Sequence, residues 1–332
     1  MSTYTILVTD YAWPNLEIEQ QLLATVGGEL LVAEKGSAEE ITRLAPQADA
    51  ILSCWAKLPE AALDAAPRCR IVSRYGIGLD NIPIQRATEL GILVTNVPDF
   101  CSEEVSDHAM ALLLALARQI VPQAAASRAG GWQRETGQMI PRLRGQTLGL
   151  IGYGNSARGL VPKAQGFGLK VLAYTPRLAA GRLANGVEAV ANLDDLLARA
   201  DYVSLHAPLT DESRGVIDEA ALRRMKASAV LINTSRGGLI DESALVRALT
   251  EGWIAGAGLD VLVQEPPPAD HPLRSLPNVI VTPHAAFYSQ ASIAELQQKA
   301  AQNVVDVLLG KKPAHIVNRA VLTQENCRFN IQ

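Results

Sequence analysis

The amino-acid sequence predicts an α/β protein with two doubly wound parallel-sheet domains that flank a cleft. Three observations lead to this prediction. Short apolar runs of strand length alternate with segments of helix length along most of the chain, and this alternation is typical of parallel sheets covered by helices. A glycine-spaced turn near the middle of the chain starts a second series of the same kind. With 332 residues, the chain is also long enough for two domains.

The first series occupies the N-terminal part of the chain. Its expected strands and helices alternate over 4–8, 16–26, 29–33, 38–45, 50–53, 58–65 and 70–74. A long helical pattern over 103–118 lies between this series and the glycine turn. We therefore expect a domain boundary near residue 99.

The second series begins with the apolar run before the glycine turn. It continues over 170–174, 193–198, 202–205, 219–225, 230–233, 242–250, 255–259 and 279–281. A last helical pattern over 289–309 ends at Gly310, with Pro313 just beyond as a stop signal. Because this helix follows the last strand, we expect the tail to return to the first domain. The predicted domains are residues 1–99 with 288–332, and residues 100–287, and small-molecule sites are common in a cleft between such domains.

Composition excludes several classes of function. A net charge of −4 and the absence of a basic run give no footprint for nucleic acid. The four cysteines have no C-x-x-C spacing, and the N-terminal residues lack a basic region followed by an apolar core, so we expect a cytoplasmic protein with reduced thiols. The longest apolar stretch, 109–117, is too short to span a bilayer. No histidine or cysteine has metal-ligand spacing, so no metal is expected.

The glycine turn predicts a dinucleotide site. Gly152 stands where the chain turns sharply out of a strand, Gly154 where backbone approaches a pyrophosphate, and Ala157 where helix meets strand. The N–H groups at the start of the next helix, together with its dipole, would hold the phosphates. The whole turn comprises Gly152, Tyr153, Gly154, Asn155, Ser156 and Ala157.

Two further strand ends carry polar groups suited to a small acid. The segment Arg74, Tyr75, Gly76, Ile77 and Gly78 offers consecutive backbone N–H groups for a carboxylate, although an ordinary strand-to-helix turn would have the same composition. Arg236 follows an apolar strand and precedes two glycines. Its guanidinium could hold a carboxylate or carbonyl by two hydrogen bonds, whereas a structural ion pair is the alternative.

A histidine and a glutamate follow in the same series. His284 comes after an apolar strand and a proline, and an upstream carboxylate such as Glu265 could accept its Nδ1–H. That pairing would fix the tautomer and favour the imidazolium, the state that protonates a carbonyl oxygen. For His284 alone a core histidine is the better interpretation, but the combination with Arg236 and Glu265 favours a catalytic site.

Together these segments resemble the D-isomer-specific 2-hydroxyacid dehydrogenases, most closely the branch that contains the C-terminal binding proteins and 3-phosphoglycerate dehydrogenase-like enzymes. The resemblance implies a flavodoxin-like substrate domain, a Rossmann nucleotide-binding domain and a homodimer. It implies reversible, D-specific hydride transfer between a nicotinamide cofactor and C2 of a small 2-keto or 2-hydroxy acid. His284 would be the acid/base, Glu265 its orienting carboxylate and Arg236 the group that binds and polarises the substrate. The substrate carboxylate would lie on the backbone of Tyr75 to Gly78, and Phe287 would stand at the substrate wall.

The resemblance also assigns cofactor contacts. Besides the glycine turn, they fall on Thr175, Pro176, Arg177, His206, Ala207, Pro208, Thr234, Ser235 and Asp260, the last at the nicotinamide end. Most relatives carry an aspartate at the position of Thr175, where it accepts from both ribose hydroxyls. Thr175 removes the repulsion of a 2′-phosphate, and Arg177 could pair with that group. The cofactor is therefore expected to be NADP or NAD, with NADP accepted.

One alternative belongs to a different class. The same branch includes transcriptional corepressors, so a nucleotide-sensing scaffold with little turnover is the competing interpretation. The short segment after the last helix favours an enzyme. Glu265 favours 2-hydroxyacid chemistry over that of the related formate dehydrogenases, which lack a glutamate there.

Overall fold

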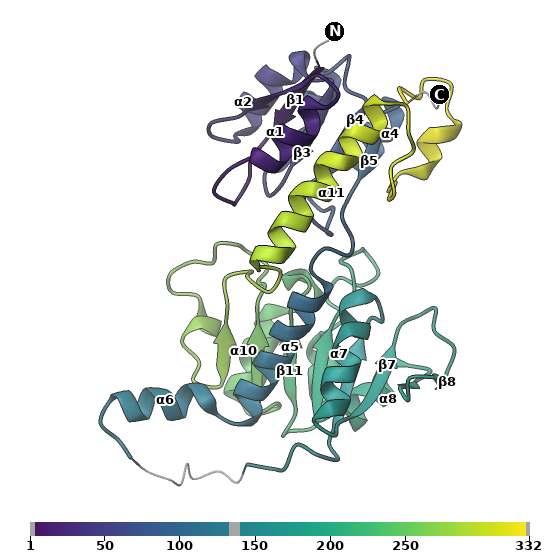
Figure 1. The fold of residues 1–332 in the computed structure, drawn as a ribbon. Helices are drawn as coiled ribbons and strands as arrows, with labels where there is room; N and C mark the ends of the chain where they lie inside the picture. The colour runs from purple at the N-terminus through teal and green to yellow at the C-terminus, as the bar shows by residue number, and fades with distance from the viewer. Residues whose placement is uncertain (1–3, 133–139, 330–332) are drawn as a thin grey trace. The chain divides into compact units, whose positions relative to one another are not determined.

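In the computed structural model, residues 4–132 and 140–329 are described, and the chain divides into two compact units (Figure 1). Unit 1 comprises Met1–Phe100 and Ser289–Gln332, and unit 2 comprises Cys101–Tyr288. Each unit contains one sheet, of five strands in unit 1 and eight in unit 2. The predicted α/β class with parallel sheets is confirmed.

The sheet of unit 1 is parallel throughout and has the order β2-β1-β3-β4-β5. This is the flavodoxin-like order. The strands are β1 (Tyr4–Val8), β2 (Gly28–Val32), β3 (Ala50–Ser53), β4 (Ile71–Arg74) and β5 (Leu93–Thr95). The helices are α1 (Glu17–Ala24), α2 (Ala38–Leu44), α3 (Glu60–Asp64), α4 (Ile84–Glu89) and α11 (Gln290–Leu308), with short 3-10 helices at Ala45–Gln47 and Arg319–Thr323.

The central strands of unit 1 are short and begin with apolar residues, as expected for strands with both faces covered. All four residues of β3 and of β4 are buried. Sequence analysis did not separate α4 and β5, which have six and three residues and are too short to show a period.

The C-terminal segment completes unit 1. Helix α11 begins at a capping box formed by Ser289 and Ser292 and lies against α1 and β4 (Figure 1). Beyond it, the N–H of Val317 donates to the carbonyl of Val94 at 2.8 Å, which covers the outer edge of β5. Within the described residues the tail thus returns to the N-terminal sheet.

The sheet of unit 2 has the order β13-β12-β11-β10-β6-β7-β9-β8. All neighbours are parallel except β8 and β9. The strands are β6 (Thr147–Ile151), β7 (Lys170–Tyr174), β8 (Gly181–Arg182), β9 (Glu188–Ala189), β10 (Tyr202–Leu205), β11 (Val230–Asn233), β12 (Gly256–Leu259) and β13 (Val279–Val281). The helices are α5 (Ser102–Ala117), α6 (Ile120–Arg128), α7 (Asn155–Gly166), α8 (Leu193–Arg199), α9 (Glu219–Arg224) and α10 (Glu242–Thr250), with short 3-10 helices at Gly237–Leu239 and Pro272–Arg274.

The direction of winding in unit 2 reverses between β6 and β10, which are neighbours in the sheet although distant in sequence. In open α/β sheets, ligands bind beyond the carboxyl ends of the strands at such a point. Sequence analysis did not predict the β8–β9 hairpin or α6. The hairpin strands have two residues each, and none of the α6 residues is buried, so neither element has a hydrophobic period.

Within the described ranges, no single helix is long and apolar enough to cross a membrane. Helices α5 and α6 meet the requirements of length and composition only as a pair, bent by 63°.

Candidate functional site

The glycine turn lies between β6 and α7, at the switch point of the unit 2 sheet. Gly152 has φ +94°, and a Cβ atom there would lie 2.5 Å from the carbonyl carbon and oxygen of His206, so only glycine fits. At Gly154, which caps α7, an added Cβ would meet no heavy atom within 4 Å. Ala157 is fully buried where the helix packs on the sheet. The turn therefore has a position that accepts only glycine at Gly152, open space at Gly154 before the helix N-terminus, and a small buried residue at Ala157.

His206 lies beside this turn, at the end of β10. Its Nε2 is 2.9 Å from the hydroxyl of Ser204, and its Nδ1 is 3.3 Å from the hydroxyl of Ser156. The ring is buried, and burial lowers the pKa of His206 to about 4. The imidazole is therefore neutral near pH 7 and adds no charge to the phosphate end of the turn.

The other predicted cofactor residues lie at neighbouring strand ends. Thr234, just after β11, is buried, and its hydroxyl has no hydrogen-bond partner among the described residues. Ser235 is held through its own hydroxyl, which donates to the carbonyl of Leu205 at 2.9 Å. After β7, the chain turns at Thr175, where Pro176 and Arg177 are exposed. The open Gly154 cap and the buried, unpartnered Thr234 hydroxyl fit a bound dinucleotide.

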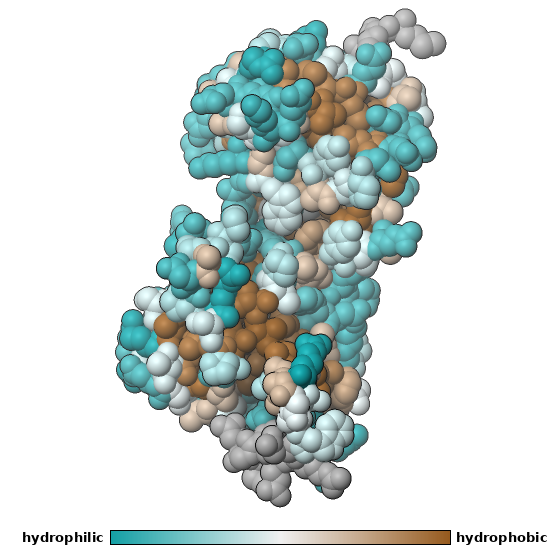
Figure 2. All heavy atoms as spheres, turned by 90° about the vertical axis from the view of Figure 1, so that its left-hand side faces the viewer, coloured by the Kyte–Doolittle hydropathy of each residue, from teal (hydrophilic) through white to brown (hydrophobic). Residues whose placement is uncertain are grey.

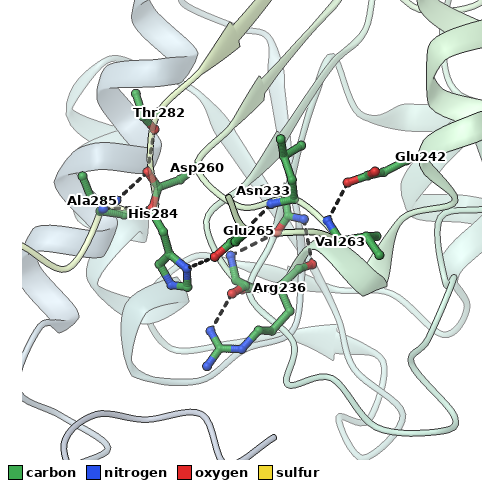
Figure 3. Close-up of polar contacts among 12 residues, drawn as sticks. Asn233, Arg236, Glu242, Asp260, Val263, Glu265, Thr282, His284 and Ala285 are labelled. Carbon is green, nitrogen blue, oxygen red and sulfur yellow. Dashed lines mark hydrogen bonds and ion pairs between the residues drawn. The ribbon is translucent and has the colours of Figure 1, made fainter. Parts of the chain in front are cut away.

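His284 and Glu265 form a close pair (Figure 3). Nδ1 of His284 lies 2.6 Å from Oε2 of Glu265, and Oε1 of Glu265 accepts the N–H of Leu262 at 2.9 Å. Because an ionised carboxylate only accepts hydrogen bonds, Nδ1 carries the proton, and any proton transfer by His284 would go through Nε2. Burial acts to raise the pKa of Glu265, but the hydrogen bond and charge of His284, the N–H of Leu262 and the charge of Arg236 together outweigh it and leave that pKa lowered.

The backbone around His284 is fixed by Asp260, which follows β12. His284 has φ +52°, unusual for a residue other than glycine. The Asp260 side chain is fully buried and accepts the N–H groups of Ala285 and Ala286 at 2.9 and 2.8 Å and the hydroxyl of Thr282 at 2.5 Å (Figure 3). Sequence analysis assigned Asp260 to the nicotinamide end of the cofactor. Both of its carboxylate oxygens also hold the turn that presents His284.

Two further residues support the His284–Glu265 pair, and neither of these roles was predicted from the sequence. His108, on α5, has its Nε2 2.9 Å from the Thr282 hydroxyl and 3.5 Å from Oδ1 of Asp260. Glu242, the first residue of α10, accepts the N–H of Val263 at 2.6 Å and lies 3.3 Å from His271 (Figure 3). They come from helices remote in sequence, and no local spacing could have linked them to His284.

Arg236 is the second cationic side chain near Glu265 (Figure 3). Its guanidinium Nη1 donates to the carbonyl of Ser235 at 2.8 Å, and its positive charge contributes to the lowered pKa of Glu265. The next residue, Gly237, packs so closely on the backbone of Leu262 and Val263 that a Cβ atom there would clash. The residues predicted at the ends of β11, β12 and β13 are thus brought together in unit 2. Phe287 is also near, with its ring edge-on to His284 and the ring centroids 6.3 Å apart.

The predicted carboxylate loop lies in unit 1, after β4. Arg74 is buried, its guanidinium faces the ring of Trp55 at 5.9 Å, and it occupies the space that a side chain on Gly76 would need. The N–H of Tyr75 donates to the carbonyl of Ser53 at 2.8 Å, and the N–H of Gly76 donates to the carbonyl of Arg74 at 3.0 Å. Because these two donors are already used, the structure narrows the expected carboxylate donors from Tyr75–Gly78 to the N–H groups of Ile77 and Gly78.

The fold and the strand-end groups of unit 2 define a dinucleotide-dependent oxidoreductase. Residues 110–286, just over half of the chain, match the family model described as "D-isomer specific 2-hydroxyacid dehydrogenase, NAD binding domain". A glyoxylate reductase from Korarchaeum cryptofilum is 43% identical over 263 residues, which cover 78% of this chain and 79% of the relative. A D-3-phosphoglycerate dehydrogenase from Methanocaldococcus jannaschii is 40% identical over 328 residues, which cover 96% of this chain and 60% of that protein.

A solved structure agrees with these relatives. The crystal structure of an NADPH-dependent glyoxylate/hydroxypyruvate reductase from Sinorhizobium meliloti, in complex with NADP and malonate, has a TM-score of 0.83 and 29% identity, and covers 100% of this chain and 99% of its own. The chain belongs to the D-isomer specific 2-hydroxyacid dehydrogenase family and is an NAD(P)-dependent enzyme of that family. The competing interpretation, a nucleotide-sensing scaffold, is not favoured.

Proposed function

We propose that this enzyme reduces a small 2-keto acid at C2 and that glyoxylate and hydroxypyruvate are the first substrates to test. The 2.6 Å contact between His284 and Glu265 carries the proposal, because it supplies a proton donor of fixed tautomer. The substrate class follows the names of the relatives, which act on glyoxylate or on glyoxylate and hydroxypyruvate.

Each strand-end group then has a role. The nicotinamide supplies the hydride when it is bound. His284 Nε2 gives a proton to the keto oxygen as charge develops there, and Glu265 stabilises the imidazolium. Arg236 binds and polarises the substrate, and Phe287 contributes to its wall. The N–H groups of Ile77 and Gly78 receive the substrate carboxylate.

The proposed cofactor preference is NADP. Thr175 has no carboxylate to repel a 2′-phosphate, and Arg177 is an exposed cation two residues further along the same turn. An arginine fork is well suited to a phosphate. The 2′-phosphate on the adenosine ribose of NADP would then be recognised by the charge of Arg177. In NAD-selective relatives a carboxylate bonded to both ribose hydroxyls has this role.

The working assembly is proposed to be a homodimer formed through unit 2. Ile120 and Val121 at the start of α6 and Trp132 beyond its end are 54%, 49% and 83% exposed, so this segment leaves large apolar side chains uncovered. Figure 2 shows apolar side chains gathered on one face of this unit. The compartment proposed is the cytoplasm, since all four cysteines are free thiols and three of them are buried.

Oxidation of NADH and NADPH with a panel of 2-keto acids, including glyoxylate, hydroxypyruvate and phenylpyruvate, tests the proposal. His284→Ala is expected to lower kcat about 10²–10⁴-fold, because the proton donor is lost. The matched control is His315→Ala, an exposed histidine of unit 1. Full turnover by His284→Ala would show that another group donates the proton.

A further inference from the structure

Unit 1 contains a buried carboxylate that the proposed reaction does not use. Glu19 and Leu23 form the buried face of α1, and Glu19 is 0% exposed. Positions four residues apart on the inner face of a helix are normally apolar. Burial raises the pKa of Glu19, which reflects the cost of holding a carboxylate there.

Two donors from distant parts of the chain meet this carboxylate. Oε1 of Glu19 accepts the hydroxyl of Tyr75 at 2.9 Å, and Oε2 accepts the side-chain amide of Gln297, on α11, at 2.9 Å. The same amide nitrogen also donates to the carbonyl of Asn15 at 3.1 Å. Helices α1 and α11 and the residue after β4 are therefore tied to one pair of oxygens.

Tyr75 is the first residue of the loop that carries Ile77 and Gly78. Its side chain is 1% exposed and packs edge-on against Trp13, with ring centroids 4.7 Å apart and an interplanar angle of 75°. Its N–H is bound to Ser53, and the carbonyl of Gly76 accepts the N–H of Val97 at 3.0 Å. The Tyr75 side chain is thus buried within unit 1, and its hydroxyl is an anchor for the loop.

Packing alone does not require a carboxylate here, because well-packed apolar residues would be at least as stable in a buried site. A carboxylate accepts and never donates, so it can satisfy a hydroxyl and an amide donor at the same time. A leucine in its place accepts neither hydrogen bond, so both donors would lose their acceptor. What Glu19 adds is one defined arrangement of these three side chains.

We propose that Glu19 is a positioning residue for substrate binding, which acts by holding the Tyr75 hydroxyl and thereby the backbone of Ile77 and Gly78. This inference rests on the proposed role of that loop in binding the substrate carboxylate. It assigns a function to a residue on α1 that contacts neither the proposed substrate donors nor any predicted cofactor residue through a described hydrogen bond.

Two variants test the inference, each against a matched control. Tyr75→Phe keeps the ring on Trp13 and removes only the hydroxyl, while Glu19→Leu removes both acceptors. The control is Ser73→Ala, because the buried Ser73 hydroxyl also makes a single hydrogen bond, to the carbonyl of Ala300 at 2.9 Å. Ser73 connects β4 to α11 without touching the Tyr75 hydroxyl.

Steady-state kinetics with glyoxylate and saturating NADPH give the first readout. Both test variants are expected to raise the KM for glyoxylate about 3–10-fold, the effect of one lost hydrogen bond, with kcat changed less than about 2-fold. The KM for NADPH should not move. The double variant should raise the KM no more than the more severe single variant does, since both remove the hydrogen bond of the Tyr75 hydroxyl. Ser73→Ala should leave the KM for glyoxylate unchanged.

Hydrogen exchange of the peptide spanning residues 74–80 gives a readout that needs no activity. Faster exchange in Tyr75→Phe and Glu19→Leu, but not in Ser73→Ala, together with the raised KM supports the inference. Unchanged exchange in Tyr75→Phe overturns it, and so does equal loosening in Ser73→Ala. Faster exchange with an unchanged KM would mean that the anchor holds the loop but that the loop does not bind substrate, which overturns the proposed carboxylate site instead.

Discussion

The buried His206 makes the stability of unit 2 depend on pH in a defined direction. An unfolded chain takes up a proton on this imidazole near pH 6.5, whereas in the folded protein burial lowers the pKa to about 4. Between these values the unfolded state binds more protons than the folded state, so stability falls as the pH drops. Above pH 6.5 both states are neutral at this group, and it contributes no pH dependence.

The size of the effect follows from the two pKa values. Each pKa unit is equivalent to about 1.4 kcal/mol, so a change from 6.5 to about 4 corresponds to about 3 kcal/mol, reached near pH 4. At pH 4.5 most of this loss, about 2–3 kcal/mol, should already be present. A typical free energy of unfolding is about 5–15 kcal/mol, so one histidine accounts for a measurable part of the acid sensitivity.

Guanidinium unfolding of the wild type and of His206→Gln at several pH values between 4.5 and 7.5 measures the effect. The amide of glutamine can still bond to the hydroxyls of Ser204 and Ser156 but cannot titrate. The difference in free energy of unfolding between wild type and variant should shift by about 2–3 kcal/mol across this range. His315→Gln, at an exposed histidine, should show no such shift. Parallel pH curves for wild type and His206→Gln would refute the reasoning.

Two further substitutions test the nucleotide site. Gly152→Ala should destabilise unit 2 by about 2–5 kcal/mol, because the new Cβ meets the His206 backbone at φ +94°; a melting temperature within about 1 °C of wild type would contradict this. Gly154→Ala should keep the melting temperature, since the new Cβ enters open space, but it should weaken nucleotide binding. An unchanged affinity by calorimetry would mean that the cofactor phosphates do not bind at Gly154. Thr175→Asp should lower the kcat/KM ratio of NADPH to NADH about 10-fold or more, a like-charge effect of order 1.4 kcal/mol, and an unchanged ratio would exclude Thr175 from cofactor choice.

Sequence analysis identified the elements whose signal is local. The strands over 50–53 and 230–233 are fully buried, and each appears in the sequence as three apolar residues followed by one polar residue. The turn after β6 has a glycine where the backbone geometry requires one. The short strand β5 and the hairpin of β8 and β9 were not predicted, because two or three residues carry no period.

The predicted pairing of His284 with Glu265 could be inferred because both follow strand ends, and parallel strands end at one edge of a sheet. The supports of that pair could not be inferred. His108 and Glu242 lie on helices, and only the packing of α5 and α10 on the sheet brings them to Thr282 and Val263. The same holds for Glu19, whose place on an inner helix face gives no sign that its partners are Tyr75 and Gln297.

The sequence by itself determined the class of fold, the family and the types of residue available for chemistry. Apolar periods, glycine spacing and strand-end side chains are all patterns within short stretches of sequence, so they can be recognised without the structure. Tertiary structure decided which donors remain for a ligand. It showed that the N–H groups of Tyr75 and Gly76 are already bonded within unit 1 and that Asp260 is occupied with the His284 turn. A backbone N–H or a carboxylate oxygen is used in a hydrogen bond only when a partner atom lies within about 3 Å of it. That proximity arises from packing between segments far apart along the chain.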